Sequence, residues 1–411
     1  MKFYVYLITL ILSLSLMDYS FSNPVGLTVQ EGVIYREGKP IQTIGVNYFD
    51  GFHRAIKDPN DKSYEKGFAE LNHYQIKFVR FAITPWWAYE FKLYFDDPAE
   101  FYRRLDLFVK SAEENNIGLI PSFFWKYAAA PDMMREPNQA WGDPDSKTTA
   151  FVKKITTEIV MRYRNSPAIW AWEFANEMDL QVDLPKANRS SMGEIFNPKN
   201  KLSWWCPPIR TEKDALRTAD ILHGMKVFSE TVRSLDPLRM LSTGNAVPRA
   251  GSWHLYHHGK WGKNTRENFL EMLRIQNPEP YAISQHVYPD LPEIEAKEIV
   301  GESGDPYNRI TLSAKWAKEN KRAYFLGEWG WGRHFADKLE GPVNDEKEKR
   351  MRECVDRYIT TIKNNNIQLA AIWVYDFNYN TPDSQIYTIR GDNRRAWVLD
   401  KIKEFNISIA K

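Results

Sequence analysis

The amino-acid sequence predicts an α/β fold, a closed (β/α)8 TIM barrel with a short N-terminal hairpin and a long loop insertion after the fourth strand. Eight short apolar runs, rich in β-branched and aromatic residues, follow one another along the 411 residues. Amphipathic stretches with helical periodicity separate most of these runs. The first run lacks the Gly-rich phosphate turn of an open dinucleotide-binding sheet. Eight successive β-then-α units therefore favour a closed barrel over an open, doubly wound sheet.

The elements are expected in the following order. Leu27–Pro40 alternates in polarity and turns at Gly32 and Gly38, which predicts the hairpin. The barrel strands are expected at Thr43–Tyr48, Phe78–Ile83, Gly118–Phe124, Ile169–Phe174, Met240–Thr243, Ala282–His286, Ala323–Leu326 and Ala370–Val374. The clearest helices are expected at Ser63–His73, Pro98–Asn115, Lys147–Arg164, Thr211–Leu235, Ile310–Asn320 and Asp345–Asn364. The insertion is Asp179–Pro208, and Asp392–Lys411 is expected to complete the last helix.

The first 22 residues are expected to form a secretory signal peptide. Lys2 supplies a positive charge, and the apolar segment Phe3–Met17 follows it. Ser20 and Ser22 provide small residues before a cleavage site at Asn23. The alternative is a transmembrane anchor, but the apolar segment is shorter than the roughly 20 residues that a spanning helix needs. We therefore expect a secreted protein, extracellular or periplasmic, without stable membrane insertion after cleavage, in which residues 23–411 form one catalytic barrel domain.

Composition narrows the classes of partner. Lys and Arg number 55 against 53 Asp and Glu, a net charge of +2, so no strong field favours nucleic acid or an anionic membrane. The outlier is the aromatic content, with 15 Trp. Cys206 and Cys354 are the two cysteines, and whether they pair is open.

Two glutamates follow apolar strands and indicate the chemistry. Glu177 comes just after the fourth expected strand, and Glu328 just after the seventh. Barrels of this kind place their reactive groups at the carboxyl ends of the strands, so the two carboxylates are expected to meet in one cleft. A carboxylate pair suits cleavage of a glycosidic bond, in which one group donates a proton and the other attacks or activates water.

Other polar residues at strand ends are candidates to support this pair. Asn176 precedes the first glutamate and could hold a sugar hydroxyl. Arg80, at the end of the second strand, is a natural partner for Glu328 and is expected to lower its pKa. His286 and Tyr288 alternate on one face of the sixth strand, so both can point into the barrel mouth. No HExxH or comparable spacing is present, and we expect neither a metal nor an organic cofactor.

Many tryptophans fall at strand ends or in the loops that follow. Their flat rings suit stacking against the apolar faces of sugars, although some are expected only to pack the loops. The tryptophans assigned to substrate binding are Trp125, Trp204, Trp205, Trp329 and Trp373.

The ordered set of motifs resembles the retaining glycoside hydrolases of clan A, and among them family 5, the cellulase and β-mannanase family. The resemblance rests on Asn176-Glu177, His286-Val287-Tyr288, Glu328 and Trp373 in this order along the chain. It implies Glu177 as acid/base, Glu328 as nucleophile, and Arg80, Asn176, His286, Tyr288 and Trp373 as supporting and substrate-binding residues. Many cellulases of that family have a His after the third strand, where this chain has Trp125-Lys126, and this difference favours a mannanase-like or less familiar specificity.

The sequence therefore predicts a secreted retaining β-glycosidase that acts on β-mannan, β-glucan or a related β-linked substrate. Three alternatives stay open: a transglycosylase with the same site, a non-catalytic carbohydrate-binding barrel, and a cofactor-dependent barrel enzyme. The intact glutamate pair argues against the second, and the missing phosphate or metal pattern against the third.

Overall fold

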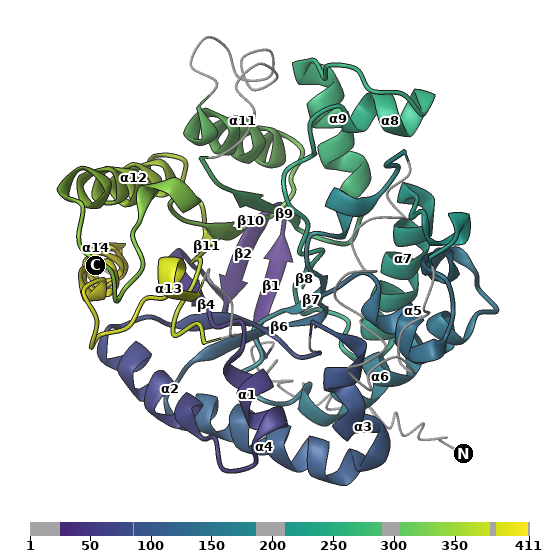
Figure 1. Cartoon of the computed structure of the whole chain (residues 1–411), viewed down its shortest axis with the longest axis horizontal. Helices are drawn as coiled ribbons and strands as arrows, with labels where there is room; N and C mark the ends of the chain where they lie inside the picture. The colour runs from purple at the N-terminus through teal and green to yellow at the C-terminus, as the bar shows by residue number, and fades with distance from the viewer. Residues whose placement is uncertain (1–24, 85, 186–209, 290–304, 379–383, 410–411) are drawn as a thin grey trace, which may run out of the picture.

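Eight parallel strands surround a common axis in the computed structural model, which describes residues 25–84, 86–185, 210–289, 305–378 and 384–409 (Figure 1). Their hydrogen-bonded order is β8-β7-β6-β5-β4-β11-β10-β9. A parallel bridge between Ser242 and Ala282 joins the two ends of this series, β8 and β9. The fold is therefore the (β/α)8 barrel that the sequence predicts.

The strands lie where the apolar runs indicate. The barrel strands are β4 (Thr43–Asn47), β5 (Phe78–Ala82), β6 (Gly118–Phe124), β7 (Trp172–Ala175), β8 (Leu241–Ser242), β9 (Ile283–Val287), β10 (Tyr324–Trp329) and β11 (Leu369–Ile372). The helices are α1 (Gly51–Lys57), α2 (Ser63–His73), α3 (Lys92–Asp96), α4 (Pro98–Glu114), α5 (Ala129–Met134), α6 (Lys147–Tyr163), α7 (Thr218–Leu235), α8 (Ser252–His258), α9 (Arg266–Gln276), α11 (Pro306–Glu319), α12 (Asp345–Asn364), α13 (Ser384–Tyr387) and α14 (Ala396–Ile409).

The predicted N-terminal hairpin is part of a three-stranded antiparallel sheet of β1 (Leu27–Gln30), β2 (Val33–Arg36) and β3 (Lys39–Pro40). This sheet lies at the amino-terminal end of the barrel, where Leu27 exchanges backbone hydrogen bonds with Trp170 and Met240. Its apolar side chains pack on residues of the barrel strands. In Figure 1, β1 and β2 lie at the centre of the ring of strands. The hairpin therefore closes the end of the barrel opposite to the strand ends that carry the glutamates.

Most helix boundaries agree with the sequence prediction, and α7 differs for a local reason. A short 3-10 helix, Glu212–Asp214, precedes α7 because Asp214 accepts a hydrogen bond from the Thr211 backbone. A new start follows at Thr218, where the Asp220 carboxylate accepts from the backbone of Arg217. The helix thus begins seven positions later than expected.

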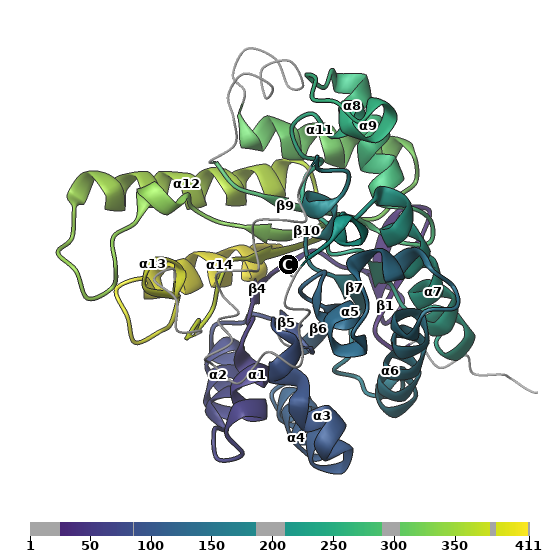
Figure 2. The same ribbon diagram turned by 45° about the vertical axis from the view of Figure 1, so that its right-hand side comes forward.

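The last helix, α14, is hydrogen-bonded to the first barrel strand. Asn406 of α14 accepts a hydrogen bond from the Ile44 backbone nitrogen at 2.9 Å and donates to the Ile44 carbonyl at 2.9 Å. These two bonds tie the end of the chain to the first barrel strand, β4. Figure 2 shows α11, α12 and α14 side by side on the outside of the barrel.

Several sequence predictions concern residues outside the described ranges. They are the signal peptide over residues 1–22, most of the insertion, Trp204, Trp205 and Cys206, and they stay predictions. Cys354 is buried beside Tyr307, and its pairing with Cys206 is untested. Within the described ranges, no helix combines the length and apolar character that crossing a bilayer requires.

Candidate active site

The barrel gathers the predicted polar residues at the carboxyl ends of its strands. Arg80 is on β5, Glu177 follows β7, His286 is on β9 and Glu328 is on β10. Because parallel strands end at the same rim, residues far apart in the sequence become neighbours there. The structure thus brings Arg80, Asn176, Glu177, His286, Tyr288 and Glu328 into one hydrogen-bonded group.

His286 lies between the two glutamates and contacts both. The Nδ1 atom of His286 lies 2.9 Å from Glu177 Oε1 and 3.5 Å from Glu328 Oε1. One ligand atom from each of these three residues lies within 4.8 Å of the others. The side chain of Glu177 is 31% exposed and that of Glu328 is 7% exposed. The pair therefore opens towards solvent on the Glu177 side.

Glu177 has an uncommon backbone conformation. Its φ of +49° and ψ of 31° lie in the left-handed region, which costs a non-glycine residue energy and occurs often at functional sites. Its backbone N–H donates to the Gly244 carbonyl at 2.8 Å. A side chain at position 244 would not fit, because its Cβ would lie 1.7 Å from the Ala175 carbonyl oxygen. The close approach of the loop after β8 therefore helps to hold the conformation of Glu177.

Arg80 is the centre of the buried network under the glutamates. Its Nη1 donates to Glu328 Oε1 at 2.7 Å and to Asn47 Oδ1 at 3.0 Å. Its Nε donates to Glu173 Oε1 at 2.6 Å, and its Nη2 to Asn176 Oδ1 at 2.8 Å. The guanidinium is fully buried and is neutralised by carboxylates on two different strands.

Sequence reasoning missed two members of this network, Asn47 and Glu173. Glu173 is fully buried in β7, and its second carboxylate oxygen accepts from the Ser242 hydroxyl at 2.9 Å. A signal was present, because a carboxylate inside a strongly apolar strand requires a buried cationic or hydrogen-bonding partner. Asn47 donates from its amide to the Gly327 carbonyl at 2.9 Å, which links β4 to β10.

His286, on β9, and Tyr288, just after it, both contact the glutamates. The Tyr288 hydroxyl donates to Glu328 Oε2 at 2.8 Å. Burial lowers the pKa of His286 to about 4, with Arg80 adding to the effect and Glu328 opposing it. The imidazole is therefore neutral near pH 7, and its Nδ1 is hydrogen-bonded to Glu177 Oε1. Gly327 leaves room for the ring, because a Cβ at that position would lie 2.9 Å from His286 Nε2.

The two catalytic candidates differ in how their charge is stabilised. Burial raises the pKa of Glu177, and the Arg80 guanidinium opposes this rise. Burial also raises the pKa of Glu328, where His286, Arg80 and the Tyr288 hydroxyl oppose the rise and Glu177 adds to it. The expectation that Arg80 would bring the pKa of Glu328 below its ordinary value is therefore wrong, because burial outweighs that attraction.

The tryptophans divide into a partly exposed ring and two buried rings. Trp373, after β11, is partly exposed beside Phe49, with ring centroids 6.0 Å apart. Trp125 is buried beneath it and lies 4.5 Å from the Arg80 guanidinium, so it supports the network from below. Trp329 is fully buried and packs on Tyr358 of α12, at a centroid distance of 5.3 Å.

The placement of Trp329 does not fit the sugar-binding role that we expected for it. Successive residues of a strand point to opposite faces, so Glu328 in the mouth requires Trp329 to point outward. Of the three assigned tryptophans that lie in the described ranges, Trp373 has the placement that a sugar platform requires.

Glu177, His286 and Glu328 are also the described residues that could hold a metal ion. However, Arg80 and Tyr288 already bond the two oxygens of Glu328, at 2.7 Å and 2.8 Å. A cation would have to displace these donors. The arrangement is therefore better suited to proton transfer and nucleophilic attack than to metal ligation.

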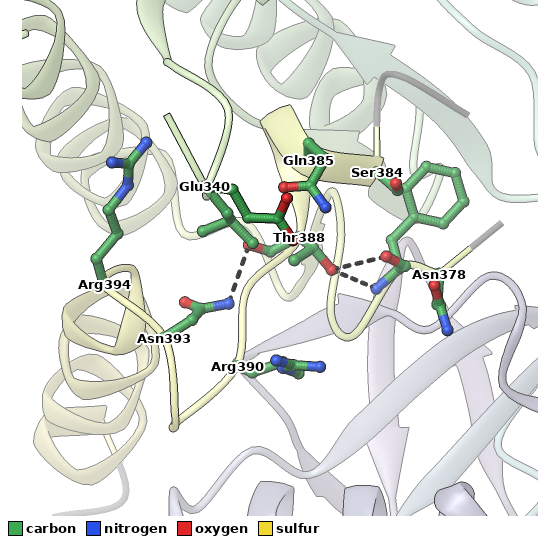
Figure 3. A pocket seen from close by; sticks show the side chains of 10 residues that line it. Glu340, Asn378, Ser384, Gln385, Thr388, Arg390, Asn393 and Arg394 are labelled. Atoms are coloured by element: carbon green, nitrogen blue, oxygen red, sulfur yellow. Dashed lines mark hydrogen bonds between the residues drawn. The ribbon is translucent and has the colours of Figure 1, made fainter. Parts of the chain in front are cut away.

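A polar cavity of about 430 Å³ lies next to this site (Figure 3). Its walls include Glu340, Asn378, Gln385 and Arg390, from the loops around α13. Phe377 also lines it and packs against Trp373, with ring centroids 5.8 Å apart. The cavity and the exposed tryptophan thus share one aromatic wall.

A (β/α)8 barrel with two facing carboxylates at the carboxyl ends of its strands has the arrangement that glycoside hydrolysis requires. Comparison with known proteins specifies the family. The model of the family described as Cellulase (glycosyl hydrolase family 5) matches residues 34–380, so the chain belongs to glycosyl hydrolase family 5. This confirms the resemblance predicted from the sequence.

Individual relatives agree with this assignment. The chain is 27% identical over 180 residues to mannan endo-1,4-beta-mannosidase A of Podospora anserina, a match covering 43% of this chain and 39% of that relative's length. The endo-1,4-beta-mannanase of Rhizomucor miehei shares the fold with a TM-score of 0.60 at 13% identity, covering 94% of this chain and 99% of that chain. The hyperthermostable endo-1,4-beta-D-mannanase of Thermotoga petrophila RKU-1 gives 0.59 at 15% identity, covering 89% and 99%.

Proposed function

We propose that the protein is a retaining β-glycosidase that cleaves a β-linked polysaccharide or oligosaccharide through a covalent glycosyl-enzyme. The spacing of Glu177 and Glu328 carries this proposal, because one oxygen from each lies within 4.8 Å of the other. Retaining glycosidases have carboxyl groups about 5–5.5 Å apart, whereas inverting enzymes need about 6.5–9.5 Å to admit a water molecule. The short spacing supports direct attack by one of the two carboxylates.

The roles follow from the contacts of each glutamate. Glu328 accepts hydrogen bonds from Arg80 and Tyr288, which stabilise its ionised form. Arg80 does not bond Glu177 directly, and Glu177 contacts the neutral His286. When the pair holds one proton, that proton therefore resides on Glu177. Glu328 is the nucleophile, and Glu177 is the acid/base.

The reaction then has two steps. The Glu328 carboxylate attacks the anomeric carbon while Glu177 gives its proton to the departing glycosidic oxygen. Glu177, now ionised, takes a proton from water, and the resulting hydroxide attacks the anomeric carbon and releases Glu328. The Tyr288 hydroxyl stays bonded to Glu328 in the resting state and steadies the carboxylate that leaves in the second step.

We propose β-mannan as the first substrate to test, with β-glucan as the second. The name of the Podospora anserina relative, and those of the two structures with the same fold, favour mannan. The partly exposed ring of Trp373 offers a stacking surface for a sugar. Arg80 bonds the carbonyl of the Asn176 amide, which leaves the amide NH2 to donate to a sugar hydroxyl.

A substrate screen combined with two variants tests the proposal. The mature protein should hydrolyse at least one of mannan, glucan, xylan and aryl β-glycosides. Glu328→Ala should abolish nearly all activity, and azide should restore turnover with a glycosyl azide of inverted configuration as the product. Glu177→Ala should lose about 10²–10⁴-fold on unactivated substrates but much less on aryl glycosides with good leaving groups, which need no proton.

Glu230→Ala is the matched control, because Glu230 is an exposed carboxylate on the outer helix α7. It should leave activity unchanged. Equal losses on activated and unactivated substrates would contradict the acid/base role of Glu177. Binding without turnover would favour a non-catalytic barrel, and transfer to a sugar acceptor in place of water would favour a transglycosylase.

We also propose that the protein is exported. The apolar segment Phe3–Met17 and the small residues Ser20 and Ser22 support this proposal. Expression with the full N-terminus should yield a secreted product that begins at Asn23. Retention of an uncleaved N-terminus in the membrane fraction would contradict it.

A further inference from the structure

Lys126 lies in the loop that follows β6, two residues after the strand ends at Phe124. It follows Trp125, which lies 4.5 Å from the Arg80 guanidinium. The Lys126 ammonium is partly buried and lies 4.9 Å from the centroid of the Trp86 ring and 4.8 Å from that of Tyr127. Trp87 is 5.8 Å away. Lys126 is thus a cation in an aromatic cage at the rim that carries the glutamates.

This ammonium has no carboxylate counter-ion in the part of the chain that the structure describes. No Asp or Glu oxygen of these residues lies within 4.0 Å of its Nζ. The nearby Asp132 is bonded to Arg210 at 2.7 Å, and Arg210 also contacts Asp214 at 3.2 Å. Burial and Arg210 lower the pKa of Lys126 to about 8 while Asp132 opposes this, so the side chain remains mainly cationic at neutral pH.

The cage is connected to the reactive centre by aromatic contacts. The Trp86 ring packs edge-on against Phe49, with centroids 6.3 Å apart. Phe49 in turn contacts Trp125 at 4.7 Å and Trp373 at 6.0 Å. The partly exposed rings of Trp373 and Trp86 thus pack on the same buried ring, Phe49, and a sugar chain on the Trp373 platform can extend towards Trp86 and Lys126.

We propose that Lys126, with Trp86 and Trp87, forms a subsite for a sugar unit that carries a carboxylate, so that the enzyme prefers β-glycans in which some of the units are uronic acids. This inference rests on the proposed glycosidase function and specifies its substrate class. The rings take the apolar face of the sugar, and the ammonium pairs with its carboxylate. A neutral hydroxyl would satisfy a hydrogen bond but would leave the partly buried charge without an anion.

The test compares one polymer in two forms. The neutral polymer that the enzyme cleaves best is used untreated, and again after oxidation of a minority of its C6 hydroxymethyl groups to carboxylates. The wild type should have the higher kcat/KM on the oxidised form. Lys126→Met should lower the ratio of the two kcat/KM values about tenfold, since it removes one charge-assisted bond. Lys126→Arg should retain most of the preference, and added salt should weaken it in the wild type.

Lys154→Met is the matched control, because Lys154 also lies over a ring, 4.8 Å from the centroid of Tyr94, but on the outer helix α6. It should leave the ratio unchanged. A wild type without preference for the oxidised polymer, or a Lys126→Met variant that changes both substrates equally, would overturn the subsite.

Calorimetric binding of neutral and oxidised oligosaccharides separates this inference from the proposed function. If turnover is absent but oxidised chains bind more tightly in a Lys126-dependent way, the subsite stands and the hydrolase proposal fails. If neutral polymer is cleaved but Lys126→Met binds both forms like the wild type, the subsite fails and the hydrolase proposal stands.

Discussion

Glu173→Gln tests whether the buried network beneath the reactive pair controls both stability and catalysis. Glu173 accepts from Arg80 Nε at 2.6 Å and from the Ser242 hydroxyl at 2.9 Å, and it is fully buried. Glutamine has nearly the same shape and can still accept from Arg80, while its NH2 can donate to Ser242. The substitution therefore removes a charge and largely preserves the geometry.

The magnitude follows from burial. Two unit charges about 4 Å apart interact by roughly 4 kcal/mol at an effective dielectric constant near 20. Breaking a buried ion pair costs about 3–5 kcal/mol, because one charge is left uncompensated. Arg80 keeps its bond to Glu328, so we expect the lower end, about 3 kcal/mol of unfolding free energy. The same substitution at Glu230, in an exposed pair with Lys226, should cost less than about 1 kcal/mol.

Activity should change in a defined direction as well. With Glu173 neutral, the Arg80 charge acts more fully on Glu328 and lowers its pKa. Glu173 also helps to raise the pKa of His286, and this contribution is lost. The acid limb of the kcat/KM profile should therefore move to lower pH. Urea unfolding and pH–rate profiles on one substrate measure the two effects. A stability loss no larger than that of the Glu230 control, or an acid limb that moves to higher pH, would refute this reasoning.

Three further predictions follow from the site. Trp373→Ala should raise KM on polymer about two- to tenfold, since ring contacts contribute about 0.5–1.5 kcal/mol; an unchanged KM in a folded variant would contradict the platform role. EDTA should leave activity intact, and a loss that a divalent cation restores would show that Glu177, His286 and Glu328 hold a metal. Burial raises the pKa of Asp179 to about 7. Between about pH 4 and pH 7 the folded protein therefore holds one proton more than the unfolded chain. Its free energy of unfolding should fall by about 2–4 kcal/mol as the pH rises through this range. Asp179→Asn should flatten that part of the pH–stability curve. A slope equal to that of the wild type would contradict the assignment of this pH dependence to Asp179.

The sequence was most informative where a periodic pattern continued over several residues. The bounds of β6 and α12 agree with the apolar run and the amphipathic stretch that predict them. Short elements carry too few residues for such a pattern, and β3, with two residues, was missed for this reason. Helix α8 was also missed. Its seven residues are flanked by Gly251 and Gly259, both in the left-handed region, and such glycines are typical of loops.

The candidate site likewise has features that the sequence predicts and features that it does not. Residues that end strands, such as Glu177 and Glu328, were predictable because the rim of a barrel collects them. The direction in which a side chain points was predictable in principle from alternation, which places Trp329 opposite to its neighbour Glu328. The left-handed backbone of Glu177 was not predictable, because it depends on a contact with Gly244 from a different loop.

The charge balance of the network explains why two similar glutamates can have different roles. Among the residues that the structure describes, Glu173, Glu177 and Glu328 share one guanidinium, that of Arg80, and one neutral imidazole, that of His286. With all three carboxylates ionised, the cluster would carry an excess of two negative charges in a largely buried space, which favours uptake of a proton. Glu173 and Glu328 each have a direct bond to Arg80, so the proton goes to Glu177, which has none. The difference between acid and nucleophile therefore arises from which carboxylates Arg80 bonds. Substitutions that redistribute these hydrogen bonds should change which glutamate holds the proton while the barrel remains folded.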